Sequence, residues 1–273
     1  MFKTFQMELA GRPLIIETGK MAKQANGAVL VRYGDTVVLV ATTASKEPRE
    51  GTDFFPLTVD YEEKMYAVGK MPGGFLRREG RPGNSAILNA RLIDRPIRPL
   101  FDKRCRNDVH VVATVLSVDY DNAPELCGML GASASIGISD IPWDGPIAGV
   151  RIGRVDGKYV VNPTQEQLAE SSMNITVAGS EEAIMMVEGG ANDAPEEEVL
   201  DAIMFGHETI KELCRFQKKI IEEVGKPKRT MVFPEVPEEI DEAVAAYATE
   251  DLKKAIFDAD KLRRDGNIDA VKK

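Results

Sequence analysis

The spacing of apolar positions predicts short strands in the first part of the chain. Alternating or continuous apolar runs bounded by turn residues are typical of strands. Such runs lie at residues 5–10, 14–18, 28–33, 36–43 and 56–61. Gly34 and Asp35 separate the third run from the fourth and favour a tight hairpin. The run at 36–43 is β-branched and apolar on both faces, so we expect a central strand there.

The middle of the chain alternates between strand and helix periods. Residues 109–118 are apolar on both faces and predict a buried strand. A helix is expected at 122–139, with Asn122 as its cap and Pro124 in its first turn. Small residues in the middle of this helix favour close packing against a sheet.

Two hairpins and two helices are predicted beyond residue 145. The hairpins pair 147–152 with 158–161 and 173–178 with 183–187. Thr164 can cap a short helix that runs to about residue 171, and Asp193 can cap a long helix at 195–224 that ends at Gly225. The apolar stripe of the long helix, which predicts a side facing the core, consists of Val199, Ile203, Ile210, Leu213, Phe216, Ile220 and Val224.

This order of elements predicts an α+β fold with helices on one face of each sheet. We expect one domain at 1–225, a proline-rich linker at 226–237 and a separate helical segment at 238–273. The last segment is expected to contain one amphipathic helix at about 238–264. A single helix cannot bury its own apolar stripe, so this segment is interpreted as the start of a truncated all-helical domain.

Composition indicates an ordinary globular protein and excludes several classes. The 273 residues are 43% hydrophobic and 29% charged, and no apolar run is long enough to span a bilayer. The N-terminus has neither a signal peptide nor a transit peptide pattern. The three cysteines are far apart in sequence, which excludes a disulfide framework and a CxxC metal site. A reducing compartment, the cytoplasm, is therefore expected.

Positive charge is concentrated in one short window of an acidic chain. The net charge is −9, yet residues 70–106 contain ten basic and only three acidic residues. Such a local field attracts anions, and the planar guanidinium group matches phosphate geometry. Phe75 lies between two turn signals, Pro72–Gly74 and Gly80–Gly83, so it is expected at the tip of an exposed loop.

A short helix is expected after this loop. Asn84 or Ser85 can cap it, and Pro96 and Pro99 would stop it near residue 95. Arginines along the window predict binding of nucleic acid or polyphosphate, with base stacking on the aromatic tip. The alternative interpretation is that these arginines form ion pairs with acidic groups from elsewhere in the chain.

Common catalytic motifs are missing. The sequence contains no GxxxxGK[ST] or GxGxxG phosphate-binding loop, and no second histidine follows His207 at zinc-protease spacing. His110 lies within a predicted strand, where a structural role is expected. No nucleophile with a neighbouring base can be identified.

Five segments nevertheless resemble the bacterial polynucleotide phosphorylase family, in the order found there. They are PGGFLRREGRP (72–82), ARLIDRPIRPLF (90–101), LGASA (130–134), VAGS (177–180) and FGH (205–207). The resemblance implies a first ribonuclease PH-like core followed by the start of an all-helical domain. It also implies a homotrimeric ring around single-stranded RNA, in which inorganic phosphate releases nucleoside diphosphates with the help of Mg²⁺. The RNA degradosome is a possible setting, in mRNA degradation.

In this family catalysis belongs to a second core, and the resemblance implies that this first core is silent. Where the active core has a run of serines for the phosphate, the aligned residues are Ala123, Pro124 and Glu125. Where it has two aspartates and a lysine, they are Leu168, Asn174 and Thr176. We therefore expect no catalytic residue, no metal site and no bound cofactor in this chain.

The same resemblance assigns RNA contact to the arginine-rich window. The match is direct for Phe75, Arg77, Arg78 and Arg81, and weaker for Arg91, Arg95 and Arg98, which could instead form structural ion pairs with Asp94 or other acidic groups. Leu76 departs from the second aromatic that is common in the family, so stacking depends on Phe75. Three other hypotheses remain: a stand-alone RNA-binding or assembly module, an active single-core enzyme and, more remotely, an enzyme acting on a small anion through the arginine cluster.

Overall fold

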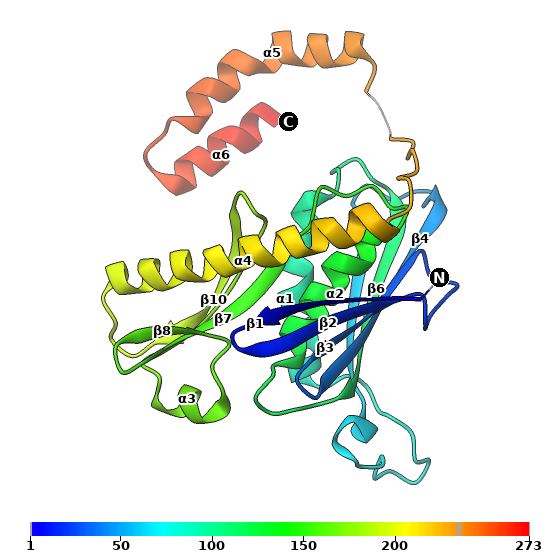
Figure 1. Ribbon diagram of the computed structural model, residues 1–273. Coiled ribbons are helices and arrows are strands. Elements are labelled where there is room, and N and C mark those ends of the chain that lie inside the picture. Colours follow the sequence, from blue (N-terminus) through cyan, green and yellow to red (C-terminus); the bar gives the residue numbers. More distant parts are fainter. Residues whose placement is uncertain (1, 234–235, 273) are drawn as a thin grey trace. The chain divides into compact units, whose positions relative to one another are not determined.

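The computed structural model describes residues 2–233 and 236–272. The chain divides into two compact units, Met1–Val232 and Phe233–Lys273. The first unit contains a six-stranded sheet and a four-stranded sheet, packed with helices (Figure 1). The expected α+β class is therefore confirmed. In the part of the chain that the structure describes, no helix combines the length and the apolarity needed to cross a membrane.

The six-stranded sheet has the order β1-β2-β3-β4-β6-β5. Its strands are β1 (Lys3–Leu9), β2 (Arg12–Thr18), β3 (Gly27–Tyr33), β4 (Thr36–Pro48), β5 (Leu57–Glu63) and β6 (Asn107–Ser117). All pairs are antiparallel except β5 with β6, which is parallel. The expected hairpin between β3 and β4 and the central place of β4 are confirmed.

The expectation that residues 109–118 are buried on both faces is wrong. Burial alternates along β6: Val109, Val111, Ala113 and Val115 are buried, whereas His110 is exposed. The helices α1 (Asn84–Ile97) and α2 (Pro124–Ile138) both belong to this part of the unit, and α2 contacts β6. The opposite face of β6 is more open, so its apolar residues reflect β propensity as well as burial.

The second sheet is antiparallel throughout, with the order β10-β9-β7-β8. Its strands are β7 (Ala148–Val155), β8 (Lys158–Val161), β9 (Met173–Gly179) and β10 (Ile184–Ala191). Both predicted hairpins are present. The predicted short helix is α3 (Gln165–Glu170), and its N-cap Thr164 forms a capping box with Gln167.

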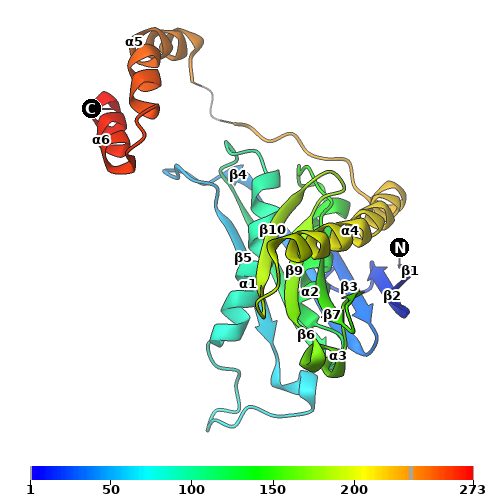
Figure 2. The same cartoon turned by 90° about the vertical axis from the view of Figure 1, so that its left-hand side faces the viewer.

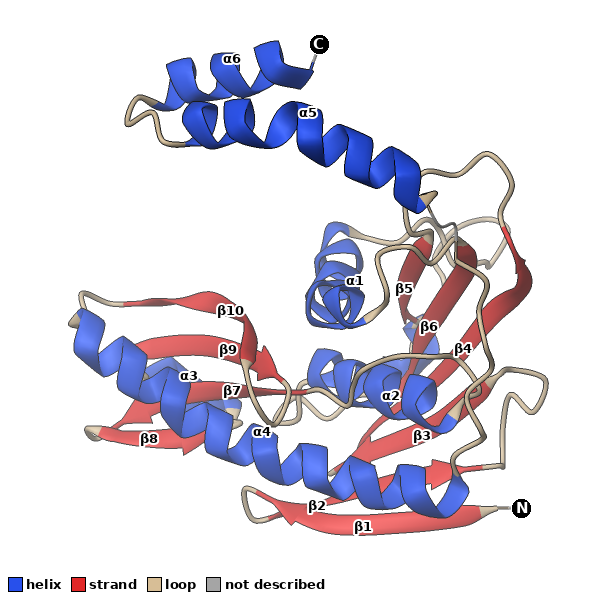
Figure 3. Cartoon of the chain, turned by 90° about the horizontal axis from the view of Figure 1, so that it is seen from above, coloured by secondary structure: helices blue, strands red, loops and turns tan. Residues whose placement is uncertain are grey.

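Helix α2 lies at the centre of the first unit. It packs on β3, β4 and β6 and also contacts β7 and α4 (Glu196–Val224), as Figure 3 shows. A Cβ at Gly131 would lie 2.5 Å from Val40 Cγ2, so the glycine permits close approach to β4. The predicted packing of small residues against a sheet is thus confirmed.

The long helix α4 covers the second sheet along β7 and β9. Of its predicted apolar stripe, Ile210, Leu213 and Ile220 are fully buried, and the other members are half-buried. Its end at Gly225 is confirmed, since Gly225 is the C-cap. Its predicted start at residue 195 differs by one residue, but the predicted cap is wrong: the N-cap is Pro195, and Asp193 lies outside the helix with positive φ.

The predicted caps of α1 and α2 are also wrong. Gly83 is the N-cap of α1, and Ser85 Oγ donates to Glu63 Oε1 at 3.3 Å. Ala123 is the N-cap of α2, while Asn122 Nδ2 donates to Asp119 Oδ2 at 2.6 Å. Both polar side chains have partners outside the helix ends, and these partners take the place of capping.

The end of α1 also differs from the expectation. Pro96 lies inside the helix, which runs to Ile97 and continues as the short 3₁₀ helix η2 (Arg98–Leu100). A proline in the last turn loses one hydrogen bond without reversing the chain direction. Helix α1 lies beside the edge strand β5 (Figure 2).

The second unit is a pair of helices, α5 (Glu238–Ile256) and α6 (Lys261–Lys272). The single helix expected at 238–264 is therefore wrong. The chain turns at two aspartates: Asp258 Oδ1 accepts from the Asp260 N–H, and Asp260 Oδ1 accepts from the Arg263 N–H, each at 2.9 Å. Aspartate side chains in such turns compete with helix continuation.

The segment that follows α4 packs on the first unit. Lys228 Nζ donates to the carbonyls of Ile136, Gly137 and Ser139, at the C-terminal end of α2. Met231 is buried beside Cys105. The compact unit thus extends past residue 225 into the segment expected as a linker, of which residues 234 and 235 lie outside the described residues.

Candidate functional site

The arginine-rich loop projects from the first unit between η1 (Met65–Val68), a 3₁₀ helix, and α1. Figure 1 shows it in cyan, extending away from the sheets. At its tip, Phe75 is 101% exposed and Leu76 is 73% exposed. These two adjacent apolar side chains do not pack into the core, so they are available for contact with a partner.

The structure divides the six arginines between Arg77 and Arg98 into two groups. Arg77, Arg78, Arg81 and Arg91 are exposed, and among the described residues their side chains have no hydrogen-bond or ion-pair partner. These four guanidinium groups form what we call the free arginine set. An external anion can bind them without breaking an ion pair within the protein.

The other two arginines are held within the protein. Arg98 makes a bidentate pair with Asp94, with Nη2–Oδ1 at 2.8 Å and Nε–Oδ2 at 3.0 Å, and it also donates to the Leu57 carbonyl. Arg95 pairs with Glu188 on β10. The alternative of structural ion pairs therefore describes Arg95 and Arg98.

A shallow groove of about 340 Å³ separates α1 from the edge strand β5. Its lining includes Thr58, Tyr61, Ile87 and Arg91. Ile87 is half exposed, so the groove combines an apolar wall with one member of the free arginine set. This groove extends the exposed surface from the loop along α1.

At the start of α2, an internal ion pair involves Glu125, one of the residues that the family resemblance aligns with a phosphate site. Arg151 Nη2 on β7 lies 2.6 Å from Glu125 Oε1, and the two side chains are 20% and 14% exposed. The adjacent cavity, lined by Ala123, Leu126 and Arg151, measures about 10 Å³. That volume holds about one water molecule.

The aligned positions on β9 lie on the same face of the second sheet as this pair. Thr176 is opposite Arg151 in the register of β7 and β9, and Asn174 is opposite Gly153. Leu168 lies on α3, and α3 packs near β7. The structure thus brings Glu125 and Thr176 together around Arg151, whereas Leu168 belongs to a separate element.

These residues do not fit a divalent cation. Magnesium prefers carboxylate and other oxygen ligands. Leu168 has no donor atom, and Asn174 and Thr176 are neutral. Within residues 2–233 and 236–272, no group of three or more His, Cys, Asp or Glu side chains could hold a metal ion.

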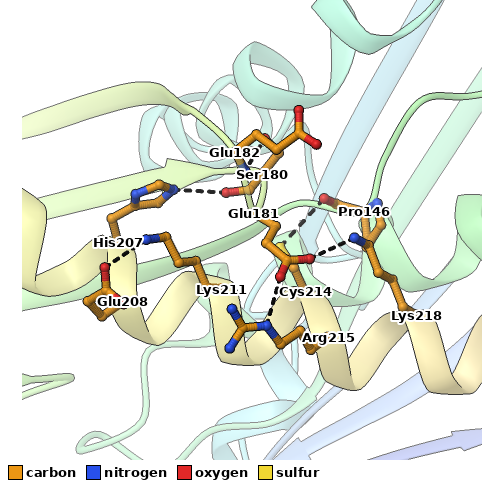
Figure 4. Close-up of polar contacts among 10 residues, drawn as sticks. All are labelled: Pro146, Ser180, Glu181, Glu182, His207, Glu208, Lys211, Cys214, Arg215 and Lys218. Carbon is orange, nitrogen blue, oxygen red and sulfur yellow. Dashed lines mark hydrogen bonds and ion pairs between the residues drawn. The ribbon is translucent and has the colours of Figure 1, made fainter.

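A second charged cluster joins the β9–β10 turn to α4 and is balanced internally (Figure 4). Glu181 accepts from Lys218 Nζ at 2.6 Å and from Arg215 Nε at 2.7 Å, and these bonds lower the pKa of Glu181. Buried His207 has Nε2 3.0 Å from the Ser180 carbonyl. These contacts fix the turn on the helix, and His207 has a structural role.

The cysteines are unsuited to nucleophilic chemistry. Burial raises the pKa of Cys127 and of Cys214 to about 12 in each case, and it also raises the pKa of Cys105. Since the thiolate is the reactive form, all three remain thiols near neutral pH.

Sequence reasoning missed two residues of these sites. Arg151 interrupts an apolar strand, Ala148–Val155, between two buried positions, and this was the available signal for a buried partner. Glu79 is the single acidic residue within the arginine loop, and its Oε1 accepts from the Met65 N–H at 2.9 Å. Neither partner could be assigned without the fold.

Comparison with known families identifies the class of protein to which this fold belongs. Residues 10–142 match the model of the 3′ exoribonuclease family, domain 1, and residues 145–209 match the model of domain 2 of the same family. The chain belongs to the 3′ exoribonuclease family.

Two of the similar proteins are bacterial polyribonucleotide nucleotidyltransferases. The protein from Heliobacterium modesticaldum is 59% identical over 271 residues, which are 99% of this chain and 38% of that protein. The protein from Geobacillus kaustophilus is 56% identical over 270 residues, 99% of this chain and 37% of that protein. The chain therefore spans less than two fifths of the length of these curated relatives.

A solved structure supports the fold. The crystal structure of rice (Oryza sativa) Rrp46 has a TM-score of 0.60 at 14% identity, covering 81% of this chain and 94% of that chain. At this identity the likeness concerns the fold alone. The expected ribonuclease PH-like core is confirmed.

Proposed function

We propose that this chain is an RNA-guiding, catalytically silent core within a longer polyribonucleotide nucleotidyltransferase. The observation that carries the proposal is the free arginine set, which lies on and beside an exposed loop with Phe75 at its tip. Guanidinium groups bind backbone phosphates, and an exposed aromatic ring stacks on bases, so the combination suits single-stranded RNA of any sequence.

The lack of catalysis in this core is inferred from the chemistry of the residues that the resemblance aligns with the active core. Phosphorolysis needs a place for the attacking phosphate and a charged group to stabilise the transition state. The Glu125 carboxylate is paired with Arg151 beside a cavity of about 10 Å³, and a bound phosphate would face that carboxylate. In this proposal, inorganic phosphate and Mg²⁺ act in the remainder of the longer protein.

The wider setting is part of the proposal, and the names of the relatives support it. Their name, polyribonucleotide nucleotidyltransferase, describes nucleotide transfer, and we propose that the longer protein degrades mRNA by phosphorolysis as a cytoplasmic homotrimer. Degradosome proteins would be its partners. In such a ring, loops from three copies would surround one strand and deliver its 3′ end to the catalytic part.

The test is the salt dependence of RNA binding. Binding of a fluorescein-labelled oligoadenylate is followed by anisotropy over a series of KCl concentrations, for the parent chain and for the triple variant R77A/R78A/R81A. Each lost phosphate contact lowers the slope of log affinity against log salt by about 0.7 for single strands, so a drop of roughly 2 is expected.

A matched control removes three cations elsewhere, in the variant K211A/K253A/K254A, whose lysines form surface pairs on α4 and α5. This control is expected to retain the parental slope. Equal slopes for the parent and for the loop variant would contradict the proposal.

A further inference from the structure

The loop of the free arginine set is closed at its base by one residue, Met65. The Met65 carbonyl accepts from the Lys70 N–H at 3.0 Å, where the loop begins. The Met65 N–H donates to Glu79 Oε1 at 2.9 Å, where the loop returns. Both arms of the loop thus meet at the same residue, and we call this pair of hydrogen bonds the Met65 clasp.

The clasp is anchored in the six-stranded sheet. The Val118 N–H, just after β6, donates to the Ala67 carbonyl of η1 at 3.3 Å. At the other end of the loop, the Arg77 N–H donates to the Gly74 carbonyl at 3.0 Å, and Arg77 has a φ of 51°. This turn presents Phe75 and Leu76 at the tip.

Glu79 makes the connection that closes the returning arm. Among the described residues, 71–82 have no other hydrogen bond or ion pair to a residue outside that segment. Without this bond, the arm carrying Arg77, Arg78 and Arg81 would have no hydrogen bond from residues 71–82 to the rest of the described chain. A longer free segment has more conformations to lose when RNA orders it.

We infer that Glu79 is a positioning residue for RNA binding, which it supports by closing the loop rather than by touching RNA. The inference rests on the proposed function of the loop. It predicts that removing the Glu79 side chain weakens RNA binding, whereas electrostatics alone predicts stronger binding. Removing a carboxylate from among three arginines would strengthen attraction to phosphate, whereas opening the clasp weakens binding.

Two substitutions at one position separate these effects. Glu79→Gln removes the charge but keeps an oxygen that can accept from the Met65 N–H, and Glu79→Ala removes both. The control Glu182→Ala removes one exposed carboxylate from the β9–β10 turn. All four chains, including the parent, are titrated with labelled oligoadenylate, and their thermal unfolding is compared.

The expected result is that E79A binds about three- to tenfold more weakly than the parent. E79Q is expected to bind as tightly as the parent or more tightly, and E182A within about twofold of it. The unfolding temperatures are expected to be unchanged. A merely structural role would not produce rescue by glutamine together with an unchanged unfolding temperature.

Limited trypsin digestion reports on the clasp without RNA. Cleavage after Arg77 and Arg78 is expected to be faster in E79A than in E79Q or the parent, because the opened loop fits a protease more readily. E79A binding as tightly as the parent, or equal cleavage of E79A and E79Q, would overturn the inference.

These outcomes are distinguishable from failure of the proposed function. If R77A/R78A/R81A loses affinity while E79A does not, the loop binds RNA and the clasp does not position it. If the triple variant keeps its salt slope, the loop does not bind RNA and the positioning role is overturned with it. Trypsin cleavage then shows whether the clasp closes the free loop.

Discussion

At the scale of single residues, the arginine window illustrates what a sequence can and cannot reveal. The cluster and its turns were readable because they depend on neighbouring residues. The division between free and paired arginines was not, because Glu188 is distant from Arg95 in the chain and reaches it through the packing of β10 near α1. Only the Asp94–Arg98 spacing gave a local indication of pairing.

The Glu125–Arg151 pair makes a prediction about stability. Arg151→Met keeps much of the side-chain volume but leaves a mostly buried carboxylate without its partner. We expect this variant to lose about 2–3 kcal/mol of unfolding free energy. The double variant E125Q/R151M should recover part of that loss, because no charge then remains to be paired.

Urea denaturation followed by circular dichroism measures both variants. The single variant E125Q serves to complete the double-mutant cycle. If R151M is as stable as the parent, then the Glu125 carboxylate does not need Arg151 as a partner and the pair does not stabilise the fold.

At the scale of elements, helix α2 depends on glycine for its contact with β4. Gly131→Ala would place a Cβ 2.5 Å from Val40 Cγ2 and 3.0 Å from Val31 Cγ2. We expect a loss of about 1–3 kcal/mol from this overpacking, offset by less than about 1 kcal/mol of helix propensity. The measurement is the midpoint of thermal unfolding.

Gly128→Ala in the same helix is the matched control. Its nearest contact would be 3.1 Å, to the Cδ1 end of Ile93, which can move. This variant is expected to be as stable as the parent or slightly more stable. Equal destabilisation by both substitutions would mean that backbone flexibility, rather than close packing on β4, explains the glycines.

The elements that sequence predicted correctly are those set by local signals. Hairpins and strands follow from a two-residue period and from turns such as Gly34-Asp35. The predicted caps failed because both side chains are engaged elsewhere: the Ser85 hydroxyl bonds to Glu63 on β5. The Asn122 amide bonds to Asp119, just before the helix, and accepts from Arg12 on β2. The break between α5 and α6 was missed because two aspartates, and no glycine or proline, make the turn.

At the scale of the whole molecule, the first unit includes the segment after α4. A chain ending at Val232 retains the three carbonyl bonds of Lys228 and the buried Met231, whereas a chain ending at Gly225 loses them. We expect the chain ending at Val232 to unfold at the same temperature as the first unit in the parent. The chain ending at Gly225 should unfold at a temperature roughly 4–8 °C lower, because it loses about 2 kcal/mol of unfolding free energy.

Calorimetry of the two truncations tests this boundary. Oligoadenylate affinity of the chain ending at Val232 should match that of the parent, since the free arginine set lies in the first unit. Identical unfolding temperatures for both truncations would show that residues 226–232 add no stability.

The sequence predicted the residues of the candidate loop, but it did not predict the partners that hold them or pair with them. The loop residues Phe75 to Arg81 were identified from composition and from a family resemblance, and the structure places them together on one exposed segment. The partners Arg151 and Glu79 required the fold. Their roles depend on the register of β7 with β9 and on where η1 meets the loop.

The central claim, a core that binds RNA without cleaving it, is tested most directly by a phosphorolysis assay of this chain. Oligoadenylate, inorganic phosphate and magnesium are supplied, and nucleoside diphosphate is measured alongside RNA binding. The account predicts salt-sensitive binding with no diphosphate released. Diphosphate that increases with the amount of chain and is abolished by a substitution within it, such as Asn174→Ala, would contradict the account and reveal an active centre in this core.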